Sequence, residues 1–397
     1  MKILYRGPIC SRSGYGQACH DNLIALRQAG LDFVGQLVVD ADTEDMPDRY
    51  KPLLSCLIED PDTRHGDYTH VIVHSIPILA YGMLDNIPPK AKRVLVTTWE
   101  TSILHDPVVA TMNGNFDLII VPSRFNADSF IKSGVDPLKI VIIPHAYDPV
   151  WWDHGGMRAE KNAKKDGLLP DTPYTFYNIG AWATRKNPMG PITAYMAEFG
   201  PDDNVCFKHV APRYYKDEIV TLLKAGGIER PPRLEIIGVR PNFLTDGQLR
   251  QLHREADCYV TLARGEGFGL GAFEATLAGN PVISTGWSGL REFLDQYPGT
   301  RYVPHFMAPC LVPPEVNGTP FHVGGIEIRT VLGPNTGIAF NQEWAEPDVG
   351  TCRKFMRRAY ESRNQKDYRV GLYEHILRER FTYEAVGRQF KRVLESL

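Results

Sequence analysis

The sequence predicts an α/β protein made of two doubly wound domains with parallel sheets. Short β-rich apolar runs alternate with longer amphipathic segments along the chain, an alternation typical of parallel strands covered by helices. The chain has 397 residues, enough for more than one domain with its own core. A polar stretch, HGGMRAEKNAKKDGLLPDTP, interrupts the alternation and therefore marks the boundary between two series of strands.

The first series indicates a domain over residues 1–150. Helices are expected between its strands, for example at Gly16–Gly30 and Ser123–Ser133. The expected strands are the apolar runs KILYR, DFVGQLVV, THVIVHS, KRVLVTT, DLIIVP and KIVIIP.

The second series indicates another domain over residues 174–382, joined to the first by a linker at 151–173. Its expected strands are YTFYNIG, NVCFKHV, RLEIIGV, DCYVTLA and PVIST. Residues 297–343 are rich in Pro and Gly, and we expect them to form a long irregular connection. The chain from about Asp348 onward is expected to be helical.

Composition narrows the class of protein. Hydrophobic residues make up 43% and charged residues 23% of the chain, the balance of a soluble globular protein. Residues 1–150 carry 13 Lys and Arg against 18 Asp and Glu, and the rest carry 31 against 29, so neither half favours a polyanion. The seven scattered cysteines form no CxxC pair, which favours reduced thiols over a disulfide framework or a zinc site. No signal peptide or membrane-spanning run is evident, so we expect a cytoplasmic location, with peripheral membrane contact left open.

Candidate ligand-binding residues are sought in the turns that follow strands, because open α/β sheets bind ligands at the carboxyl ends of their strands. The first such turn, GPICSRSGYGQ, places Gly14 and Gly16 at the start of a helix. Glycines allow close backbone approach, and helix-start N–H groups favour an anion such as phosphate. The spacing is not a full dinucleotide fingerprint, and an ordinary tight turn explains it equally well.

The turn NIGAWATRKNPMG places Arg185 and Lys186 just before an expected helix near Asn187. Two adjacent cations at a helix N-terminus repel one another and oppose the helix dipole, so an anion bound between them would explain the arrangement. The alternative is that both side chains point into solvent.

The stretch TLARGEGFGLGAFEATLAGNPVIST carries two acids, Glu266 and Glu274. Glu266 lies in a glycine-rich turn, and Glu274 falls about two turns into a helix expected at Phe268–Ala278. An interval of eight helical positions brings side chains to nearly the same face, and two carboxylates on one wall can accept hydrogen bonds from several sugar hydroxyls. A surface acid followed by a helix-start acid is the alternative explanation.

These motifs together resemble those of a known enzyme family. EGFGLGAFEATLAGNPVIST resembles the signature of retaining GT-B glycosyltransferases of family four, and NIGAWATRKNP is similar to their strand, Arg/Lys and helix element. IPHAYD, WAEPD and SGYG are similar to further elements of that family, and the resemblance spans nearly the whole chain. It implies the GT-B fold of two Rossmann-like domains facing a central cleft, with the last helix, about Tyr383–Leu397, packing back on the first domain.

The resemblance also implies an activity, namely metal-independent transfer of a sugar from a nucleotide-diphosphate sugar with retention of configuration. Glu274 would bind the ribose, Arg185 and Lys186 the diphosphate, and Glu266 the transferred sugar. Other backbone positions implied in donor binding are Gly14, Gly16, Phe268, Gly269 and Leu270. No cofactor is expected, and the acceptor is left open among a glycan, a lipid, a small molecule and a modified nucleic-acid base.

One departure from the family pattern concerns the acceptor side. Many relatives carry a His–Asp pair after the strand that here reads RVLVTTWETS, whereas this chain has Trp99 and Glu100. Trp99, Glu100, His74 and His145 are therefore the acceptor-side candidates, with Glu100 also a catalytic candidate. Either histidine could instead be structural.

Particular residues leave alternatives to this function open. Asp40 and Asp42 form an Asp-x-Asp that could hold a divalent metal in a different glycosyltransferase fold, but an acidic surface loop explains them better. A phosphorylase or nucleotide-sugar epimerase with the same fold, and a non-catalytic sugar-nucleotide binding protein, are the remaining alternatives. The joint presence of Arg185, Lys186 and the two glutamates argues against the non-catalytic alternative.

Overall fold

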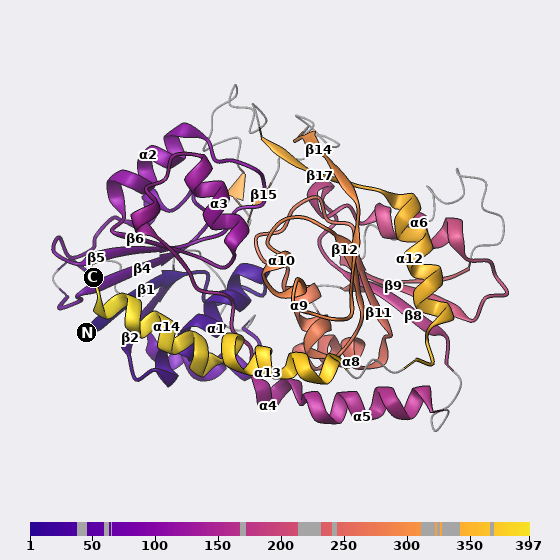
Figure 1. Cartoon of the computed structure of the whole chain (residues 1–397). Coiled ribbons are helices and arrows are strands. Elements are labelled where there is room, and N and C mark those ends of the chain that lie inside the picture. The colour runs from indigo at the N-terminus through magenta and orange to yellow at the C-terminus, as the bar shows by residue number, and fades with distance from the viewer. Residues whose placement is uncertain are drawn as a thin grey trace. The chain divides into compact units, whose positions relative to one another are not determined.

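The computed structural model describes residues 1–37, 46–58, 63, 64, 66–166, 172–212, 232–239, 244–310, 322, 323, 326, 327, 342–365 and 369–397. The chain divides into two compact α/β units (Figure 1). Unit 1 comprises Met1–His145, Met307–Trp344 and Gly387–Leu397, and unit 2 comprises Ala146–Phe306 and Ala345–Val386. Each unit has its own parallel sheet, which confirms the predicted fold class of two doubly wound α/β domains.

Unit 1 is built on a seven-stranded sheet with the order β3-β2-β1-β4-β5-β6-β7. All neighbouring strands in it pair in parallel, and the strand order reverses direction between β1 and β4. Most of the residues in its central strands are buried, as expected for a sheet covered on both faces. The strands are β1 (Lys2–Gly7), β2 (Asp32–Leu37), β3 (Leu57–Ile58), β4 (His70–His74), β5 (Lys92–Val96), β6 (Leu118–Val121) and β7 (Ile140–Ile142).

Helices cover both faces of this sheet, with α1 on one side and α2 and α3 on the other (Figure 1). The Ser13 and Ser123 side chains cap the N-termini of α1 and α3 by accepting backbone N–H bonds, a role that serine fills well. The helical elements are α1 (Gly14–Gln28), η2 (Asp48–Cys56), η3 (Tyr81–Met83), α2 (Asp106–Asn115), α3 (Arg124–Lys132) and η4 (Pro137–Lys139).

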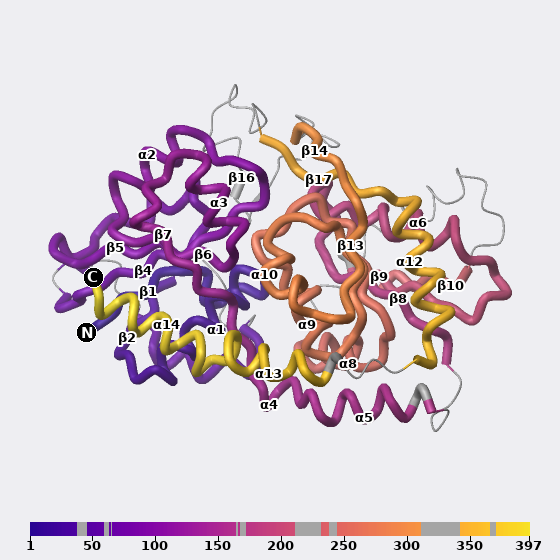
Figure 2. Tube along the Cα trace, in the orientation of Figure 1, coloured from indigo at the N-terminus to yellow at the C-terminus, as the bar shows by residue number. Residues whose placement is uncertain are grey.

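Unit 2 is built on a six-stranded sheet with the order β10-β9-β8-β11-β12-β13. Its strands are also parallel, and their path along the chain can be followed in Figure 2. The strands are β8 (Tyr174–Ile179), β9 (Val205–Pro212), β10 (Arg233–Val239), β11 (Cys258–Thr261), β12 (Val282–Thr285) and β13 (Thr300–Val303). Strand β13 falls within residues 297–343, so the expectation that this whole stretch is irregular is wrong. The strand is only four residues long and lies among Pro and Gly, which hid it.

The sheet of unit 2 is accompanied by the following helices. Helix α8 begins with a capping box between Thr245 and Gln248, and α12 packs beside α6 (Figures 1 and 2). The elements are α4 (Pro149–Trp152), α5 (His154–Lys165), η5 (Thr184–Lys186), α6 (Met189–Glu198), α8 (Asp246–Glu255), α9 (Leu270–Leu277), α10 (Arg291–Leu294), α12 (Val349–Glu361) and α13 (Arg369–Phe381).

The stretch expected to be a linker, residues 151–173, contains the end of α4 and all of α5. Both helices belong to unit 2. The Asp148 side chain caps α4, and Trp152 and Met157 are buried in the core of this unit. Only a few apolar residues anchor the otherwise polar α5, so composition alone made this segment look like a linker.

The chain ends in helix α14 (Tyr383–Glu395), whose residues from Gly387 onward belong to unit 1. The Nε2 atom of His70, on β4, lies 3.1 Å from the carbonyl oxygen of Leu394. At Gly387 the helix passes so close to α1 that a Cβ atom there would lie 2.3 Å from the carbonyl oxygen of Ala25. The remaining described strands are β14 (His305–Pro309) with β17 (Glu343–Pro347), and β15 (His322–Val323) with β16 (Ile326–Glu327).

We predict that Gly387→Ala lowers the free energy of unfolding by about 1–3 kcal/mol, because a methyl group there overlaps backbone that has to move. The matched control is Gly114→Ala near the end of α2, where a Cβ atom would meet nothing within 4 Å. This control should leave stability unchanged or raise it by up to about 1 kcal/mol, since alanine favours helices. Urea unfolding of the two variants measures the difference, and equal stabilities would contradict the close packing of α14 on α1.

Candidate functional site

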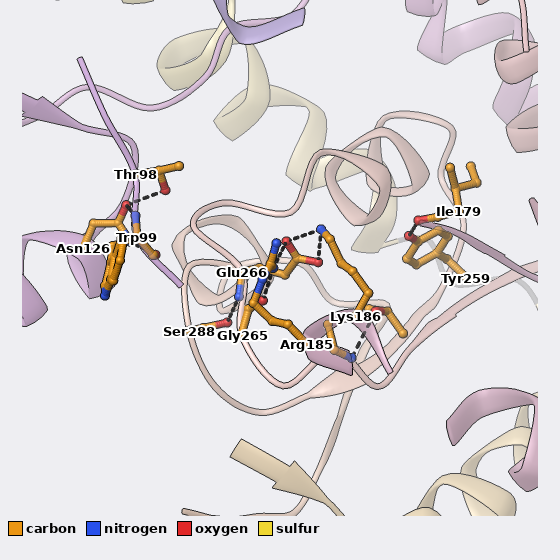
Figure 3. Close-up of polar contacts among 12 residues, drawn as sticks. Thr98, Trp99, Asn126, Ile179, Arg185, Lys186, Tyr259, Gly265, Glu266 and Ser288 are labelled. Carbon is orange, nitrogen blue, oxygen red and sulfur yellow. Dashed lines mark hydrogen bonds and ion pairs between the residues drawn. The ribbon is translucent and has the colours of Figure 1, made fainter. Parts of the chain in front are cut away.

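The candidate site lies at the carboxyl ends of β8 and β11, which are neighbouring parallel strands of unit 2. From β8 the chain goes on to β9 on one side, and from β11 to β12 on the other. A reversal of this kind is where open α/β sheets bind ligands. The structure brings together three residues predicted from the sequence, because Arg185 and Lys186 follow β8 and Glu266 follows β11 (Figure 3).

The loop that carries the two cations is fastened to the loop that follows β11. Asn187 has a left-handed backbone with φ 47°, and its side-chain amide donates a hydrogen bond to the carbonyl of Leu262 at 3.0 Å. The backbone N–H of Arg264 donates to the carbonyl of Arg185 at 2.7 Å. These bonds hold the short helix η5 in place. They therefore set the backbone positions from which the side chains of Arg185 and Lys186 extend.

The carboxylate of Glu266 is the anion that the two cations meet. Lys186 Nζ lies 2.6 Å from both of its oxygens. Arg185 Nη1 lies 3.5 Å from Oε2 and also donates to the carbonyl of Gly265 at 2.6 Å (Figure 3). The sequence predicted an anion between Arg185 and Lys186, and in the structure an acid of the same unit fills that role.

Burial of Glu266 opposes its ionisation, but the charges of Lys186 and Arg185 outweigh burial and hold the pKa of this carboxyl below its usual value. The side chain of Glu266 is 11% exposed, and those of its two partners are about one quarter exposed. An ammonium group has three N–H donors, and Glu266 occupies two of those on Lys186. The third can serve a further anion.

A serine and a glycine that sequence reasoning missed hold the backbone of Glu266. The N–H of Glu266 donates to Ser288 Oγ at 3.0 Å (Figure 3), and its carbonyl accepts from the N–H of Gly289 at 2.8 Å. Ser288 has φ 72°, and a Cβ atom on Gly289 would lie 1.9 Å from the carbonyl oxygen of Gly267. The signal in the sequence was the glycine pair in GWSGL, since such turns permit close backbone approach.

A second pair that sequence reasoning missed braces the same loops. The guanidinium of Arg264 binds both carboxylate oxygens of Glu346, at 2.5 and 2.8 Å, and donates to the carbonyl of Thr184 at 2.5 Å. Glu346 comes from WAEPD, the late element that resembles the family. This two-pronged pair is geometrically specific and ties that element to the cation loop within unit 2.

Glu274 has different partners from Glu266. It lies in α9 and is 4% exposed, and its Oε2 atom lies 3.3 Å from Nε2 of His253 on α8. His253 is fully buried and was not among the residues singled out from the sequence. The two acids were expected to share one wall of the site. In the structure Glu266 and Glu274 have different partners and separate environments.

The three predicted positions at the start of α9 have different surroundings. One lies in the core, and the others lie at the uncapped N-terminus of the helix. The ring of Phe268 packs in the core of unit 2. Gly269 has φ 93° and begins α9 without a side-chain cap, so the first amides of this helix end near the site with no capping side chain in the described structure. Leu270 is the first helical residue, two positions after Phe268.

In unit 1 the structure brings Gly14, Gly16 and His74 together at the reversal between β1 and β4. Helix α1 begins at Gly14, and a Cβ atom on Gly16 would lie 1.8 Å from the carbonyl oxygen of Ser11, so the turn needs glycine for its own packing. The ring of Tyr15, between the two glycines, lies 5.6 Å from that of His74.

The two histidine candidates of unit 1 are uncharged near neutral pH. Burial lowers the pKa of His74 to about 3, with His145 and His20 adding to the effect. Burial lowers the pKa of His145 to about 4. The Nδ1 atom of His74 lies 2.8 Å from the hydroxyl of Tyr5. These rings can take part in hydrogen bonds but do not supply positive charge.

Trp99 and Glu100 lie in a loop that helix α3 holds in place. The ring of Trp99 packs in the core of unit 1, and its Nε1 donates to the carbonyl of Ile103 at 2.9 Å. The side chain of Asn126 accepts from the N–H of Trp99 and donates to its carbonyl (Figure 3). Trp99 is therefore a structural residue, while Glu100, next to it, is half-buried.

Asp40 and Asp42, weighed as a metal site, lie outside the described residues. Across the described ranges, no group of three or more His, Cys, Asp and Glu residues is arranged to hold a metal ion. None of the seven cysteines forms a disulfide in the structure. Among the helices of the described structure, none has the length and hydrophobicity required to cross a membrane.

Two α/β units, each with its own parallel sheet, are the architecture of the GT-B fold. Solved structures support this fold. HepE of Anabaena matches with 17% identity and a TM-score of 0.62, with both chains covered completely. A glycosyltransferase of Rickettsia africae matches with 12% identity and a TM-score of 0.65, covering 100% of this chain and 98% of that one. The galactosyltransferase WaaB of the lipopolysaccharide outer core matches with 10% identity and a TM-score of 0.63, with both chains covered completely.

Residues 231–320 match the model of a family described as Family 4 Glycosyltransferase in conflict systems. These residues include Glu266 and Glu274. No curated protein sequence matches the chain. The family match and the structural matches together support a family-4 glycosyltransferase with the GT-B fold.

We predict that Glu266→Gln lowers the free energy of unfolding near pH 7 by about 1–3 kcal/mol, because Lys186 and Arg185 lose their counter-charge in a partly buried site. The pKa of Glu266 is lowered in the folded protein. Its contribution is therefore present above its usual pKa of about 4.5 and lost as the pH falls through the lower folded value.

Urea unfolding of wild type and Glu266→Gln, near pH 7 and near pH 3, tests this prediction. The difference between the two proteins should shrink at the lower pH. In a Lys186→Gln background, Glu266→Gln should cost less than in wild type, since its main partner is already gone. A difference that is independent of pH would contradict the assignment of Glu266 as the charged partner.

Proposed function

We propose that the protein is a glycosyltransferase that moves a sugar from a UDP-sugar to an acceptor hydroxyl, without a metal ion and with retention of the anomeric configuration. The observation that carries the proposal is the placement of Arg185 and Lys186 beside Glu266 and the uncapped start of α9, at the strand-order reversal of unit 2. Structures of HepE of Anabaena contain UDP with glucose and UDP-glucose, which favours UDP as the nucleotide and a hexose as the sugar.

Arg185 and Lys186 are assigned to the donor diphosphate. The leaving diphosphate gains negative charge as the bond to the sugar breaks, so cations stabilise the transition state more than the ground state. Both side chains keep a fixed position through η5 and Glu266, which means that little reorganisation is needed when the charge develops. The same two cations supply the charge neutralisation that a divalent metal supplies in other transferases.

The two acids are assigned to the two ends of the donor. Glu274 accepts hydrogen bonds from the ribose hydroxyls, and Glu266 accepts them from hydroxyls of the transferred hexose. Backbone amides at the start of α9, around Gly269 and Leu270, orient the sugar. Glu266 is ionised and paired with Lys186, a state suited to accepting hydrogen bonds, so we assign it an orienting role and not that of a nucleophile.

The proposed step is a front-face displacement. The bond between the anomeric carbon and the diphosphate oxygen breaks, and its electron pair leaves with UDP. The acceptor oxygen forms its bond to the anomeric carbon on the same face, and its proton goes to an oxygen of the departing diphosphate. Atoms and charge balance without another reactant, and the products are UDP and a glycoside of unchanged configuration.

For unit 1 we keep the roles expected from the sequence. Gly14 and Gly16 are assigned to the approach of backbone to phosphate, and Glu100 to the acceptor hydroxyl. His74 and His145 are assigned to hydrogen bonds with the acceptor as neutral rings, since burial keeps the pKa of each low.

We predict that a UDP-sugar raises the melting temperature of the purified protein by several degrees in the presence of excess chelator, because a ligand that binds only the folded state stabilises it. Glu274→Ala and Lys186→Gln should each weaken binding on the order of tenfold or more, as expected for hydrogen bonds to charged groups. Glu361→Ala and Lys354→Gln, on the exposed side of α12, are the matched controls.

Thermal denaturation with UDP-, GDP-, ADP- and dTDP-sugars measures these shifts. Stabilisation by one nucleotide only, reduced in the two site variants and unchanged in the controls, is the expected result. Equal binding by site variants and controls would remove the assigned roles of Glu274 and Lys186.

We further predict that turnover gives a glycoside with the same anomeric configuration as the donor, and that excess chelator leaves the rate unchanged. Proton NMR of the product during an acceptor screen measures the configuration. Inversion would contradict the front-face step, and loss of activity in chelator would contradict metal independence. Release of a sugar 1-phosphate, or conversion of the donor without an acceptor, would point instead to a phosphorylase or an epimerase.

A further inference from the structure

A chain of buried polar groups lies behind the carboxylate of Glu274 in unit 2. It consists of Asn280, which follows α9, Tyr177 on β8, and His253 on α8, and all three are fully buried. Polar groups at such depth are expected to have hydrogen-bond partners, because an unpaired one is costly. The partners found here run in one line toward Glu274.

The orientation of the Asn280 amide is fixed by a carbonyl. One side-chain atom of Asn280 lies 2.7 Å from the backbone oxygen of His253. A carbonyl only accepts, so this atom is the amino nitrogen, Nδ2. The same nitrogen lies 2.7 Å from the hydroxyl of Tyr177, and therefore donates to it.

The hydroxyl of Tyr177 in turn fixes the tautomer of His253. It accepts from Asn280 and lies 2.7 Å from Nδ1 of His253. Burial raises the pKa of Tyr177 far above its usual value, so the hydroxyl keeps its hydrogen. In the described structure the hydroxyl has no hydrogen-bond partner besides these two, and its hydrogen therefore points to Nδ1. A neutral imidazole that accepts at Nδ1 carries its own hydrogen on Nε2.

The Nε2 atom of His253 faces Glu274. It lies 3.3 Å from Oε2 of this acid and, among the described residues, forms no hydrogen bond of regular geometry. We propose that His253 is a positioning residue for Glu274: the order of donors from Asn280 through Tyr177 directs the Nε2–H of His253 to one carboxylate oxygen and holds that carboxylate in place.

The His253 ring itself is held on every side. Trp152 and Tyr177 meet it edge-on, at ring distances of 5.5 and 5.3 Å, and Tyr259 stacks at 6.5 Å. The ammonium of Lys161, on α5, donates to carbonyls at the end of α8, including that of Ala256 at 2.7 Å. A carboxylate hydrogen-bonded to such a ring loses rotational freedom before any ligand binds, which lowers the entropic cost of binding.

This inference rests on the proposed function, in which Glu274 binds ribose hydroxyls. A carboxylate whose orientation is fixed accepts hydrogen bonds from a set direction, so it should distinguish a ribose from a deoxyribose. His253 then determines how well the site recognises the sugar of the nucleotide, although it does not touch that sugar.

The first test is independent of any ligand. Nitrogen-15 NMR of the ligand-free full-length protein with labelled histidine, assigned by comparison with His253→Gln, reports which ring nitrogen carries the hydrogen. The expected result is a neutral ring with hydrogen on Nε2. A ring protonated on Nδ1, or on both nitrogens, would overturn the proposed order of donors.

The second test uses two substitutions that differ in reach. The amide of Gln extends about as far as Nε2 of histidine, whereas the amide of Asn extends about as far as Nδ1. His253→Gln should therefore keep a donor for Glu274, and His253→Asn should keep only the contact with Tyr177. The affinities for UDP, 2′-deoxy-UDP and 3′-deoxy-UDP are compared by calorimetry for wild type, both variants and Glu274→Ala.

We expect wild type and His253→Gln to prefer UDP over at least one deoxy analogue by about tenfold or more, and His253→Asn to lose most of this preference, as Glu274→Ala does. A general loss of folding would weaken all three nucleotides equally and leave the preference intact. If His253→Asn keeps the wild-type preference, the positioning role is wrong. If wild type itself shows no preference, the ribose role of Glu274 fails, and the functional part of this inference fails with it, while the NMR result still decides the order of donors.

Discussion

The parallel pairing of β8 with β11 is the constraint on which the site of unit 2 depends. Two parallel strands end at the same edge of a sheet, and here the chain leaves those ends toward opposite sides. The two loops must therefore lie side by side, which places Arg185 and Lys186 about 80 positions before Glu266 in the sequence and within hydrogen-bond distance of it in space. Asn187 and Arg264 turn this proximity into a fixed geometry.

Glu266 reduces the repulsion between the two cations at this edge of the sheet. Lys186 and Arg185 are adjacent cations in a partly buried loop, and without a counter-charge they would repel each other in a medium that screens poorly. Glu266 compensates one positive charge, which leaves the three residues with one net positive charge. An anion that approaches therefore meets a site that is already ordered and still attractive, a state that isolated surface cations do not reach.

Much of the fold followed from the sequence, and the failures have physical causes. The run RLEIIGV coincides with β10, an edge strand of the unit 2 sheet, because a short run rich in branched apolar residues favours a strand with little tertiary information. Strand β13 and helix α5 were missed, since four residues among prolines carry no pattern and the mostly polar α5 buries only a few side chains, such as His154 and Met157. The division into units also runs through the chain more than once, which local composition does not reveal.

The candidate site shows the same limit at the level of single residues. Arg185, Lys186 and Glu266 were predicted from strand-end turns, and the structure places them in contact with one another. Ser288 was missed although its turn carries a glycine pair, because nothing in the sequence places that turn beside Glu266. His253 was missed because a ring on a different helix leaves no trace in spacing. Trp99 was expected on the acceptor side from its position in a motif, but its ring is part of the core of unit 1, which only tertiary packing decides.

Glu266 and Glu274 differ in how they are held, and the difference bears on what each can bind. Glu266 is held by two cations, so a ligand with negative charge competes with it for the same partners and couples its position to occupancy of the site. Glu274 lies 3.3 Å from the ring of His253, and the contacts of Tyr177 and Asn280 orient that ring. A carboxylate directed in this way can accept hydrogen bonds from hydroxyl groups, which donate and carry no charge of their own. The two acids are therefore held differently, Glu266 by the charges of Lys186 and Arg185 and Glu274 beside the ring of His253, and their spacing of eight residues does not reveal this difference.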